Sequence, residues 1–142
     1  MSKNPKGKVI YRIIDANINR LKEGLRVCEE VTRFVLNSYN LTCELKKARH
    51  RIDEILKLLP GNSGFYEQRK SSTDVGRKIY INELKRSDYQ DIFFANAQRV
   101  KESLRVLEEF SKLINKRAAL EFKALRYEIY GLEKKVFKKI RP

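Results

Sequence analysis

The stretch DANINRLKEGLRVCEEVTRF, residues 15–34, decides the fold, because the chain contains it twice. Its second copy, FANAQRVKESLRVLEEFSKL, occupies residues 94–113, at a constant offset of 79 residues (94 minus 15). The identical pairs are Ala16/Ala95, Asn17/Asn96, Arg20/Arg99, Lys22/Lys101, Glu23/Glu102, Leu25/Leu104, Arg26/Arg105, Val27/Val106, Glu29/Glu108 and Glu30/Glu109. A repeat of this kind predicts a duplicated structural unit.

A weaker repeat follows each copy. LKKARHRIDEI (45–55) aligns with FKALRYEIYGL (122–132) at an offset of 77 residues (122 minus 45), so the first unit is two residues longer. A connecting turn can absorb that difference. We expect a duplicated helical hairpin, with repeat unit one at about 9–60 and repeat unit two at about 87–138, and a function where the two copies meet.

Apolar residues recur at alternating spacings of four and three, which is typical of packed amphipathic helices. The first seam, in a helix at about 9–37, is Ile10, Ile14, Asn17, Leu21, Gly24, Cys28, Val31 and Val35. The second is Leu41, Leu45, Ala48, Ile52, Ile55 and Leu59. The third is Phe93, Asn96, Val100, Ser103, Leu107, Phe110 and Ile114, after a capping box of Ser87 and Gln90. The fourth is Ala118, Phe122, Leu125, Ile129, Leu132 and Val136.

Short connections make the helices of each pair antiparallel. The sequence therefore predicts an all-α fold, a four-helix bundle made of two duplicated antiparallel helical hairpins with a long central loop at 61–86. The length of 142 residues fits a single domain, 1–142. The N-terminus MSKNPKGK has no apolar h-region and no apolar run approaches the length of a membrane span. We expect a cytoplasmic protein with no membrane partner.

The chain is strongly basic, with 32 Lys and Arg against 18 Asp and Glu and a net charge of +14. This balance favours an anionic partner. Nucleic acid, nucleotides and phosphorylated metabolites all qualify at this point. A basic surface that serves only solubility is the alternative.

The repeated stretch places an asparagine inside each of its apolar seams. At Asn17 and Asn96 an apolar side chain would contribute about 1.5–3 kcal/mol by burial, whereas a buried polar group without partners costs about 1–3 kcal/mol. The asparagines either fix the register of the helices, as they do in coiled coils, or line a polar cleft for a ligand between helices. The sequence leaves both explanations open.

Arginines and glutamates lie beside these asparagines. On a helical wheel at about 100° per residue, Arg20 and Glu23 fall on one flank of the first seam, and Arg99 and Glu102 take the same places in the second copy. Such pairs can simply stiffen a helix surface. Brought together from both copies, the same groups would line a polar cleft.

The central loop offers a second candidate site in RKSSTDVGRK, residues 69–78. Its guanidinium, ammonium, hydroxyl and glycine N–H groups suit a polyphosphate, and Asp74 could hold Mg²⁺ or accept a proton. The chain contains no Walker A motif. A solvated basic loop is the alternative.

Five segments in this order resemble one known family: YRIIDANINRLKEGLRVCEEVTRF (11–34), KKARHRIDE (46–54), RKSSTDVG (69–76), ANAQRVKESLRVLEEF (95–110) and LRYEIYGLE (125–133). The family is the monofunctional hydroxymethylpyrimidine phosphate kinase, a thiamine-biosynthesis domain often fused ahead of thiamine phosphate synthase. The resemblance implies transfer of the ATP γ-phosphoryl group, with Mg²⁺, to 4-amino-5-hydroxymethyl-2-methylpyrimidine phosphate. It also implies that this chain is a stand-alone version of the domain.

Phosphoryl transfer needs charge neutralisation and alignment more than covalent catalysis. If the resemblance holds, the residue chemistry assigns catalytic roles to Asp74, Arg69, Arg20 and Arg99. It assigns substrate binding to Asn17, Glu23, Arg26, Asn96, Glu102, Arg105 and Gly76, with the asparagines on the aminopyrimidine edge. Asp74 is the expected metal ligand, with Glu23 and Glu102 as alternatives.

The rival hypothesis is a non-enzymatic basic helical module that binds nucleic acid or a thiamine-pathway partner enzyme. It explains the net charge, but the acidic pairs at 29–30 and 108–109 would repel nucleic acid phosphates. We therefore expect a small phosphorylated pyrimidine and ATP as partners rather than nucleic acid. A homodimer through the long seams, and an association with thiamine phosphate synthase, are further partner hypotheses.

Overall fold

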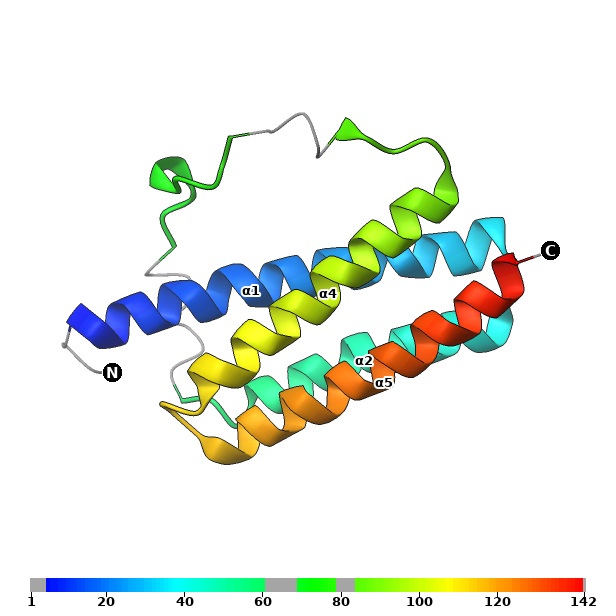
Figure 1. Cartoon of the computed structure of the whole chain (residues 1–142). Coiled ribbons are helices and arrows are strands. Elements are labelled where there is room, and N and C mark those ends of the chain that lie inside the picture. The colour runs from blue at the N-terminus through cyan, green and yellow to red at the C-terminus, as the bar shows by residue number, and fades with distance from the viewer. Residues whose placement is uncertain (1–4, 61–68, 79–83, 142) are drawn as a thin grey trace.

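The computed structural model describes residues 5–60, 69–78 and 84–141 (Figure 1). Every regular element in these ranges is a helix, so the predicted all-helical class is confirmed. The elements are α1 (Pro5–Glu30), the π-helix η1 (Val31–Val35), α2 (Tyr39–Leu56), the 3₁₀ helix η2 (Ser71–Thr73), α4 (Tyr89–Ser111) and α5 (Lys116–Ile140). None of the described helices is both long and apolar enough to cross a membrane.

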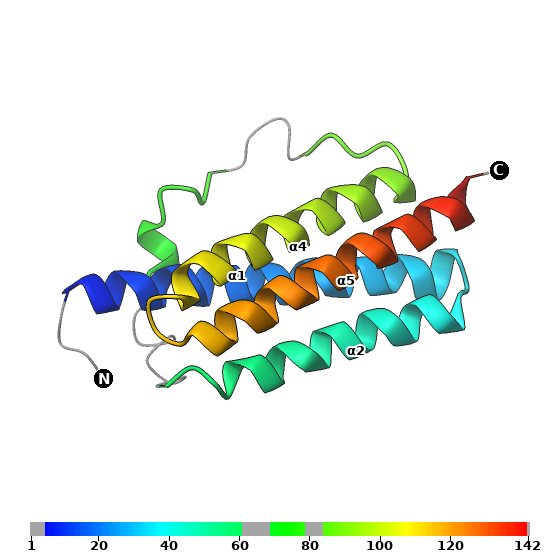
Figure 2. The ribbon, with the colours of Figure 1, turned by 60° about the horizontal axis from the view of Figure 1, so that its bottom comes forward.

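The four long helices lie side by side in a bundle (Figures 1 and 2). Helix α1 runs antiparallel to both α2 and α4, and α5 runs antiparallel to α4. The most extensive packing is between α1 and α4 and between α4 and α5, while α2 contacts α1 and α5. The described parts of the central loop pass along the side of the bundle formed by α1 and α4.

The predicted stripes of α2 and α5 face the core, because all their members are buried. These members are Leu41, Leu45, Ala48, Ile52, Ile55 and Leu59 in the first stripe, and Ala118, Phe122, Leu125, Ile129, Leu132 and Val136 in the second. Each large apolar side chain removed from water contributes about 1.5–3 kcal/mol. The period of apolar residues was therefore a sufficient guide for these two helices.

The predicted first seam is correct as far as Val31 and wrong at Val35, which is 49% exposed. The reason is η1, whose wider turn inserts one residue relative to an α-helix and rotates the following side chains out of the seam. Thr32 is buried in this region instead. Its hydroxyl donates to the carbonyl oxygen of Glu29 at 3.0 Å and shares a hydrogen bond of 2.9 Å with the hydroxyl of Thr42.

The two hairpin connections differ in length at the place where η1 lies. From buried Thr32 to Ser38, which caps α2, the chain passes through residues 33–37, whereas from buried Ser111 to Asn115, which caps α5, it passes through residues 112–114. The two additional residues of the first unit thus fall within η1 and the following turn. That turn includes Asn37, whose φ of 50° lies in the left-handed region.

The predicted capping box of α4 is displaced by one residue. Asp88, rather than Ser87, is the N-cap, since its carboxylate accepts from the backbone N–H groups of Gln90 and Asp91 at 2.9 and 3.1 Å. Asp91 in turn accepts from the backbone N–H of Ser87 at 2.9 Å. Aspartate caps a helix at least as well as serine does, so the adjacent aspartate takes the position.

Gly24 allows the close approach of α1 to α4. A Cβ atom built there would lie 2.8 Å from Cγ2 of Val100 and 3.2 Å from the backbone oxygen of Asn96. We expect Gly24→Ala to lower the free energy of unfolding by about 1–3 kcal/mol through overpacking. This loss outweighs the gain in helix propensity, which is about 1 kcal/mol.

A matched control for this substitution exists in α5, where a Cβ at Gly131 would meet nothing within 4 Å. Gly131→Ala should raise the free energy of unfolding by about 0.5–1 kcal/mol. Urea denaturation of both variants measures the difference. A stabilised Gly24→Ala variant would show that the α1–α4 contact is looser than described.

Cys28 and Cys43 are the two free thiols and differ in access to solvent. Burial, with a smaller contribution from the charge of Glu133, raises the pKa of Cys28 from 9.0 to about 12. The folded state therefore keeps this proton while the unfolded state loses it above pH 9, so the thiol's contribution to stability is complete below pH 9 and declines as the pH rises towards 12.

Because the thiolate is the reactive form, we expect only Cys43 to react with Ellman's reagent in the folded protein at pH 8. Both thiols should react after unfolding in guanidinium chloride. A Cys43→Ser variant that still releases the chromophore rapidly without denaturant would contradict the buried position of Cys28.

Candidate functional site

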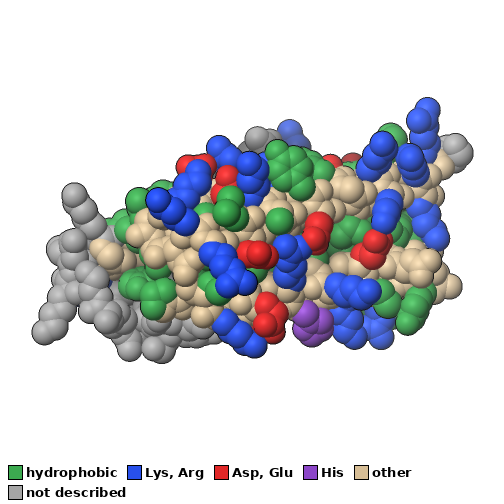
Figure 3. All heavy atoms as spheres, turned by 90° about the horizontal axis from the view of Figure 1, so that it is seen from below, with side chains coloured by type: hydrophobic (Ala, Val, Ile, Leu, Met, Phe, Trp, Pro, Cys, Tyr) green, Lys and Arg blue, Asp and Glu red, His purple; other side chains and the backbone are tan. Residues whose placement is uncertain are grey.

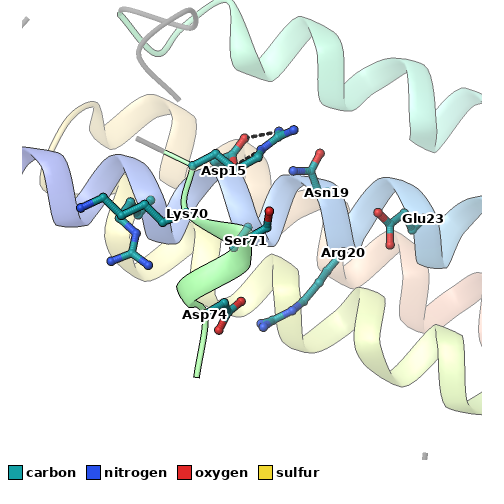
Figure 4. Close-up of a pocket in the computed structure, with 10 residues that line it drawn as sticks. Asp15, Asn19, Arg20, Glu23, Lys70, Ser71 and Asp74 are labelled. Atoms are coloured by element: carbon teal, nitrogen blue, oxygen red, sulfur yellow. Dashed lines mark hydrogen bonds and ion pairs between the residues drawn. The ribbon is translucent and has the colours of Figure 1, made fainter. Parts of the chain in front are cut away.

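A cleft of about 240 Å³ lies between α1 and the described part of the central loop (Figure 4). Its lining from α1 is Arg12, Asp15, Ala16, Asn19, Arg20 and Glu23, and its lining from the loop is Arg69, Lys70, Ser71 and Asp74. The α1 residues share one helix face because they are spaced by about one turn of helix. We call this hollow the loop cleft.

A second cleft of about 410 Å³ lies against α1 and α4. It is lined by Asn17, Arg20, Gly76, Arg99, Glu102, Ser103 and Val106. Arg20 lines both clefts, and Asp74 and Gly76, which lie two residues apart in the loop, line one cleft each. We call this second hollow the interhelix cleft and the two together the polar groove.

The loop is attached to α1 by an ion pair between Arg69 and Asp15. Nε and Nη2 of Arg69 donate to the two carboxylate oxygens of Asp15 at 2.8 and 2.7 Å (Figure 4). The side chain of Asp15 is only 9% exposed. Beyond this pair, the loop turns back on itself, and Gly76 donates its backbone N–H to Oδ1 of Asp74 at 2.8 Å.

Asn17 presents a buried acceptor at the interhelix cleft. Its residue is 5% exposed, and its Nδ2 donates to the carbonyl oxygen of Ile13 at 2.8 Å. The donor assignment fixes the amide orientation, which leaves Oδ1 as a buried oxygen without a partner in the described structure. An unsatisfied buried acceptor costs about 1–3 kcal/mol, so a hydrogen-bond donor that reached this oxygen would be favourable.

Three arginines of the groove are not neutralised by a neighbouring carboxylate. Across the described ranges, Arg12, Arg20 and Arg99 make no ion pair with a carboxylate. Carboxylates contact five arginines outside the groove, namely Arg26, Arg49, Arg51, Arg105 and Arg126. The polar groove therefore contains three guanidinium groups that remain available for an anion.

The face formed by α2 and α5 shows the contrast (Figure 3). Acidic and basic side chains are interspersed there, and several of them pair across the two helices. Arg51 contacts Glu121 and Glu128, and Lys135 contacts Glu44 at 2.8 Å. These local pairs make this face a weaker candidate for binding an anion than the polar groove.

The structure brings most of the predicted site residues together. Lining the polar groove are Asn17, Arg20, Glu23, Arg69, Asp74, Gly76, Arg99 and Glu102. Asn96 lines neither cleft, although its Nδ2 makes the bond equivalent to that of Asn17, to the carbonyl oxygen of Ile92 at 2.8 Å.

Arg26 and Arg105 also lie outside both clefts. Arg26 lies 3.7 Å from Glu29, and Arg105 donates to Glu108 at 3.0 Å. These buried glutamates also bind arginines of the neighbouring helices: Glu29 accepts from Arg49 of α2, and Glu108 accepts from Arg126 of α5. The predicted substrate role of Arg26 and Arg105 thus gains no support from their positions, which belong to ion-pair clusters between helices.

Three polar residues that α1 contributes to the groove were not predicted from the sequence, namely Arg12, Asp15 and Asn19. A signal for them existed, because Arg12, Asp15, Asn19 and Glu23 recur at spacings of three and four on one side of α1. The repeat concealed it, since Asp15 corresponds to Phe94 and Asn19 to Gln98. These residues are not identical in the two copies, so the repeat did not mark them as candidates for the site.

The carboxylates of the groove suit a metal ion that is also held by substrate phosphates, rather than one held by protein side chains alone. Within the described ranges no group of three or more His, Cys, Asp or Glu side chains could hold a metal ion. Mg²⁺ is commonly held by one or two carboxylates together with substrate phosphates and water. Asp74 and Glu23, which both line the loop cleft, suit that arrangement.

The fold and the groove define a class of protein: an all-helical bundle with one polar, arginine-lined groove beside a central loop. The chain belongs to the ThiD2 family, whose family model matches residues 12–135. This match includes every residue of the polar groove.

Curated relatives carry the name thiamine-phosphate synthase. The protein of Synechocystis is 40% identical over 126 residues, and that of Nostoc punctiforme is 39% identical over 127 residues, covering 87% and 89% of this chain. The protein of Rhodopirellula baltica is 33% identical over 129 residues. The chain spans only 34–35% of the length of these relatives. No solved structure matches it.

Proposed function

We propose that this protein transfers the γ-phosphoryl group of ATP to 4-amino-5-hydroxymethyl-2-methylpyrimidine phosphate in thiamine biosynthesis. The observation that carries the proposal is the polar groove, where Arg20 and Arg99 lie beside a buried amide oxygen, and none of the three has a partner among the described residues. Membership of the ThiD2 family and the similarity to proteins named thiamine-phosphate synthase support the pathway.

The interhelix cleft suits the pyrimidine ring. Oδ1 of Asn17 can accept a hydrogen bond from the exocyclic amino group, which would satisfy the orphaned acceptor. Ser103 is a small residue on the facing helix, and Val106 supplies an apolar contact for a ring. In this arrangement Asn17, and not Asn96, identifies the aminopyrimidine.

The charged residues suit the phosphates. Arg20 lines both clefts, and Arg99 lies across the interhelix cleft, so the two guanidinium groups can hold anionic oxygens of the acceptor and of ATP. Lys70 supplies a further cation in the loop cleft. Alignment and charge neutralisation of this kind are the main requirements of phosphoryl transfer.

Mg²⁺ would neutralise charge on the phosphates, and Asp74 and Glu23 are the carboxylates that suit it. A general base is not required for this acceptor, because the second pKa of a phosphate monoester is about 6 and its oxygen is anionic at neutral pH. We therefore assign Asp74 to the metal rather than to proton transfer. An acceptor alcohol, in contrast, would have needed a base.

The test is ³¹P NMR of the purified protein with Mg·ATP and hydroxymethylpyrimidine phosphate. A parallel sample contains the unphosphorylated alcohol in place of the phosphate. ADP and a new diphosphate pair of resonances should arise only with the phosphorylated substrate. No change in either sample, from protein that is folded by circular dichroism, would refute the proposed reaction.

We also infer that the bundle consists of two duplicated hairpins. Equivalent residues make equivalent contacts, as the amides of Asn17 and Asn96 and the arginine pairs of Glu29 and Glu108 illustrate. Since the chain corresponds to about a third of proteins named thiamine-phosphate synthase, we further propose that it works beside such an enzyme. Size-exclusion chromatography of a mixture with thiamine-phosphate synthase would detect a complex.

A further inference from the structure

The ion pair between Asp15 and Arg69 joins the described part of the central loop to α1. The hydrogen bonds that the structure describes for residues 70–78 stay within the loop: for example, the backbone N–H of Thr73 donates to the carbonyl of Lys70, and that of Asp74 donates to the carbonyl of Ser71. All residues of the range 69–78 are exposed. For residues 69–78 the pair with Asp15 is thus a direct attachment to the bundle.

The geometry of the pair suits a fixed attachment. Two parallel hydrogen bonds, of 2.8 and 2.7 Å, define both the distance and the plane of the guanidinium group. Asp15 is anchored in the middle of a helical turn of α1 and is largely removed from water, where an ion pair is less screened than at the surface.

We propose that Asp15 is a positioning residue, which holds Arg69 and thereby sets Lys70, Ser71 and Asp74 against the α1 face of the loop cleft. The effect of Asp15 on catalysis rests on the proposed function, in which these three loop residues contribute to phosphate and metal binding. Asp15 itself contacts Arg69 and needs no contact with substrate.

The first experiment measures loop order without reference to activity. Asp15→Asn, Arg69→Gln and the double variant are compared by {¹H}–¹⁵N heteronuclear NOE, which reports motion on the picosecond to nanosecond timescale. The NOE values of residues 70–78 should fall in all three variants, to the same extent, while those of the helices stay unchanged. Unchanged loop values would overturn the proposal.

A matched control is available on the other side of α1. Oδ1 of Asp53 forms an ion pair with Nζ of Lys22 at 2.8 Å, and Asp53 lines neither cleft. Asp53→Asn makes the same chemical change and should leave the loop NOE values unaltered. A fall of the loop values in this variant too would show a general loosening of the bundle and would overturn the specific role of Asp15.

The second experiment measures turnover in the ³¹P assay. Each single variant should lose about tenfold or more in kcat/KM, mainly through KM, and the double variant should be no worse than the singles within about twofold, because the two residues act as one unit. Additive losses, or unchanged kinetics in a protein with a disordered loop, would overturn the proposal.

If the unaltered protein shows no turnover, the proposed function fails and a binding measurement decides the role of Asp15. Calorimetric titration with inorganic pyrophosphate should then show affinity at least about tenfold weaker in Asp15→Asn. Equal affinity of variant and unaltered protein would overturn the proposal. So would an absence of pyrophosphate binding by the unaltered protein, because the loop would then complete no anion site.

Discussion

Replacing Asn17 by leucine is expected to reduce kcat/KM by about 10²-fold or more, while the midpoint of thermal unfolding stays equal or rises. The substitution removes the orphaned amide oxygen from the interhelix cleft and places a branched apolar side chain there. A hydrogen bond of this kind is worth about 1–3 kcal/mol when its loss leaves a buried group unpaired, and each 1.4 kcal/mol is about tenfold in rate.

Stability should not fall with activity in this variant. The residue is 5% exposed, so leucine gains apolar burial. The lost bond to the carbonyl of Ile13 leaves little penalty, because in an α-helix that oxygen also accepts from the backbone N–H four residues later. Thermal unfolding by circular dichroism and the ³¹P assay on the same preparation separate the two effects.

The repeat supplies the control, Asn96→Leu. This residue makes the same bond in α4 but lines neither cleft, so the substitution should leave kcat/KM within a few-fold of the unaltered value. If Asn17→Leu unfolds the protein while its folded fraction keeps full specific activity, the asparagine fixes register and binds no substrate. Equal losses in both variants would show that the groove is wrongly placed.

Replacing Glu108 by leucine is expected to lower the free energy of unfolding by about 3 kcal/mol, because removing one partner leaves the other charge buried without compensation. Glu108 accepts from Arg105 and Arg126, and the side chain of Arg126 is only 12% exposed. For a chain of this length the loss corresponds to a decrease of about 10 °C in the unfolding midpoint.

The equivalent residue provides a graded comparison. Glu29→Leu should be less damaging, since its partner Arg49 is more exposed and can reach water. The double variant Glu108→Leu and Arg126→Leu should recover much of the loss, because no unpaired charge remains. Denaturant unfolding of the unaltered protein, of Glu108→Leu, of Arg126→Leu and of the double variant measures the coupling. A single Glu108→Leu variant as stable as the unaltered protein would show that this cluster contributes nothing to the fold.

The helices were predictable from the sequence because their apolar period is a local signal. The spacing of apolar residues over one or two turns shows which side of a helix faces the core, so the stripes of α2 and α5 could be assigned without error. Val35 was misplaced because the additional residue of a π-helix leaves no mark in apolar spacing. The cap of α4 was misplaced because Ser87 and Asp88 are both good capping residues and only the backbone geometry distinguishes them.

The groove was only partly predictable, because its assembly depends on contacts distant in sequence. Asn17 and Arg20 could be chosen because they are polar residues at or beside an apolar seam. The pair of Arg69 with Asp15 joins residues 54 positions apart, and no local pattern signals it. Arg26 and Arg105 were chosen because they repeat, yet repetition marks residues that hold helices together as readily as residues that hold a ligand.

The loop that lies on α1 also makes the two ends of the repeated surface different from each other. Two related helices alone would offer a ligand two equivalent orientations, one the reverse of the other. Gly76 lines the groove with Asn17, whereas Asn96 lines neither cleft. A ligand bound in the reversed sense would therefore lose its contacts with the loop. A single loop thus favours one orientation of a bound ligand, even though the polar residues of the bundle occur twice.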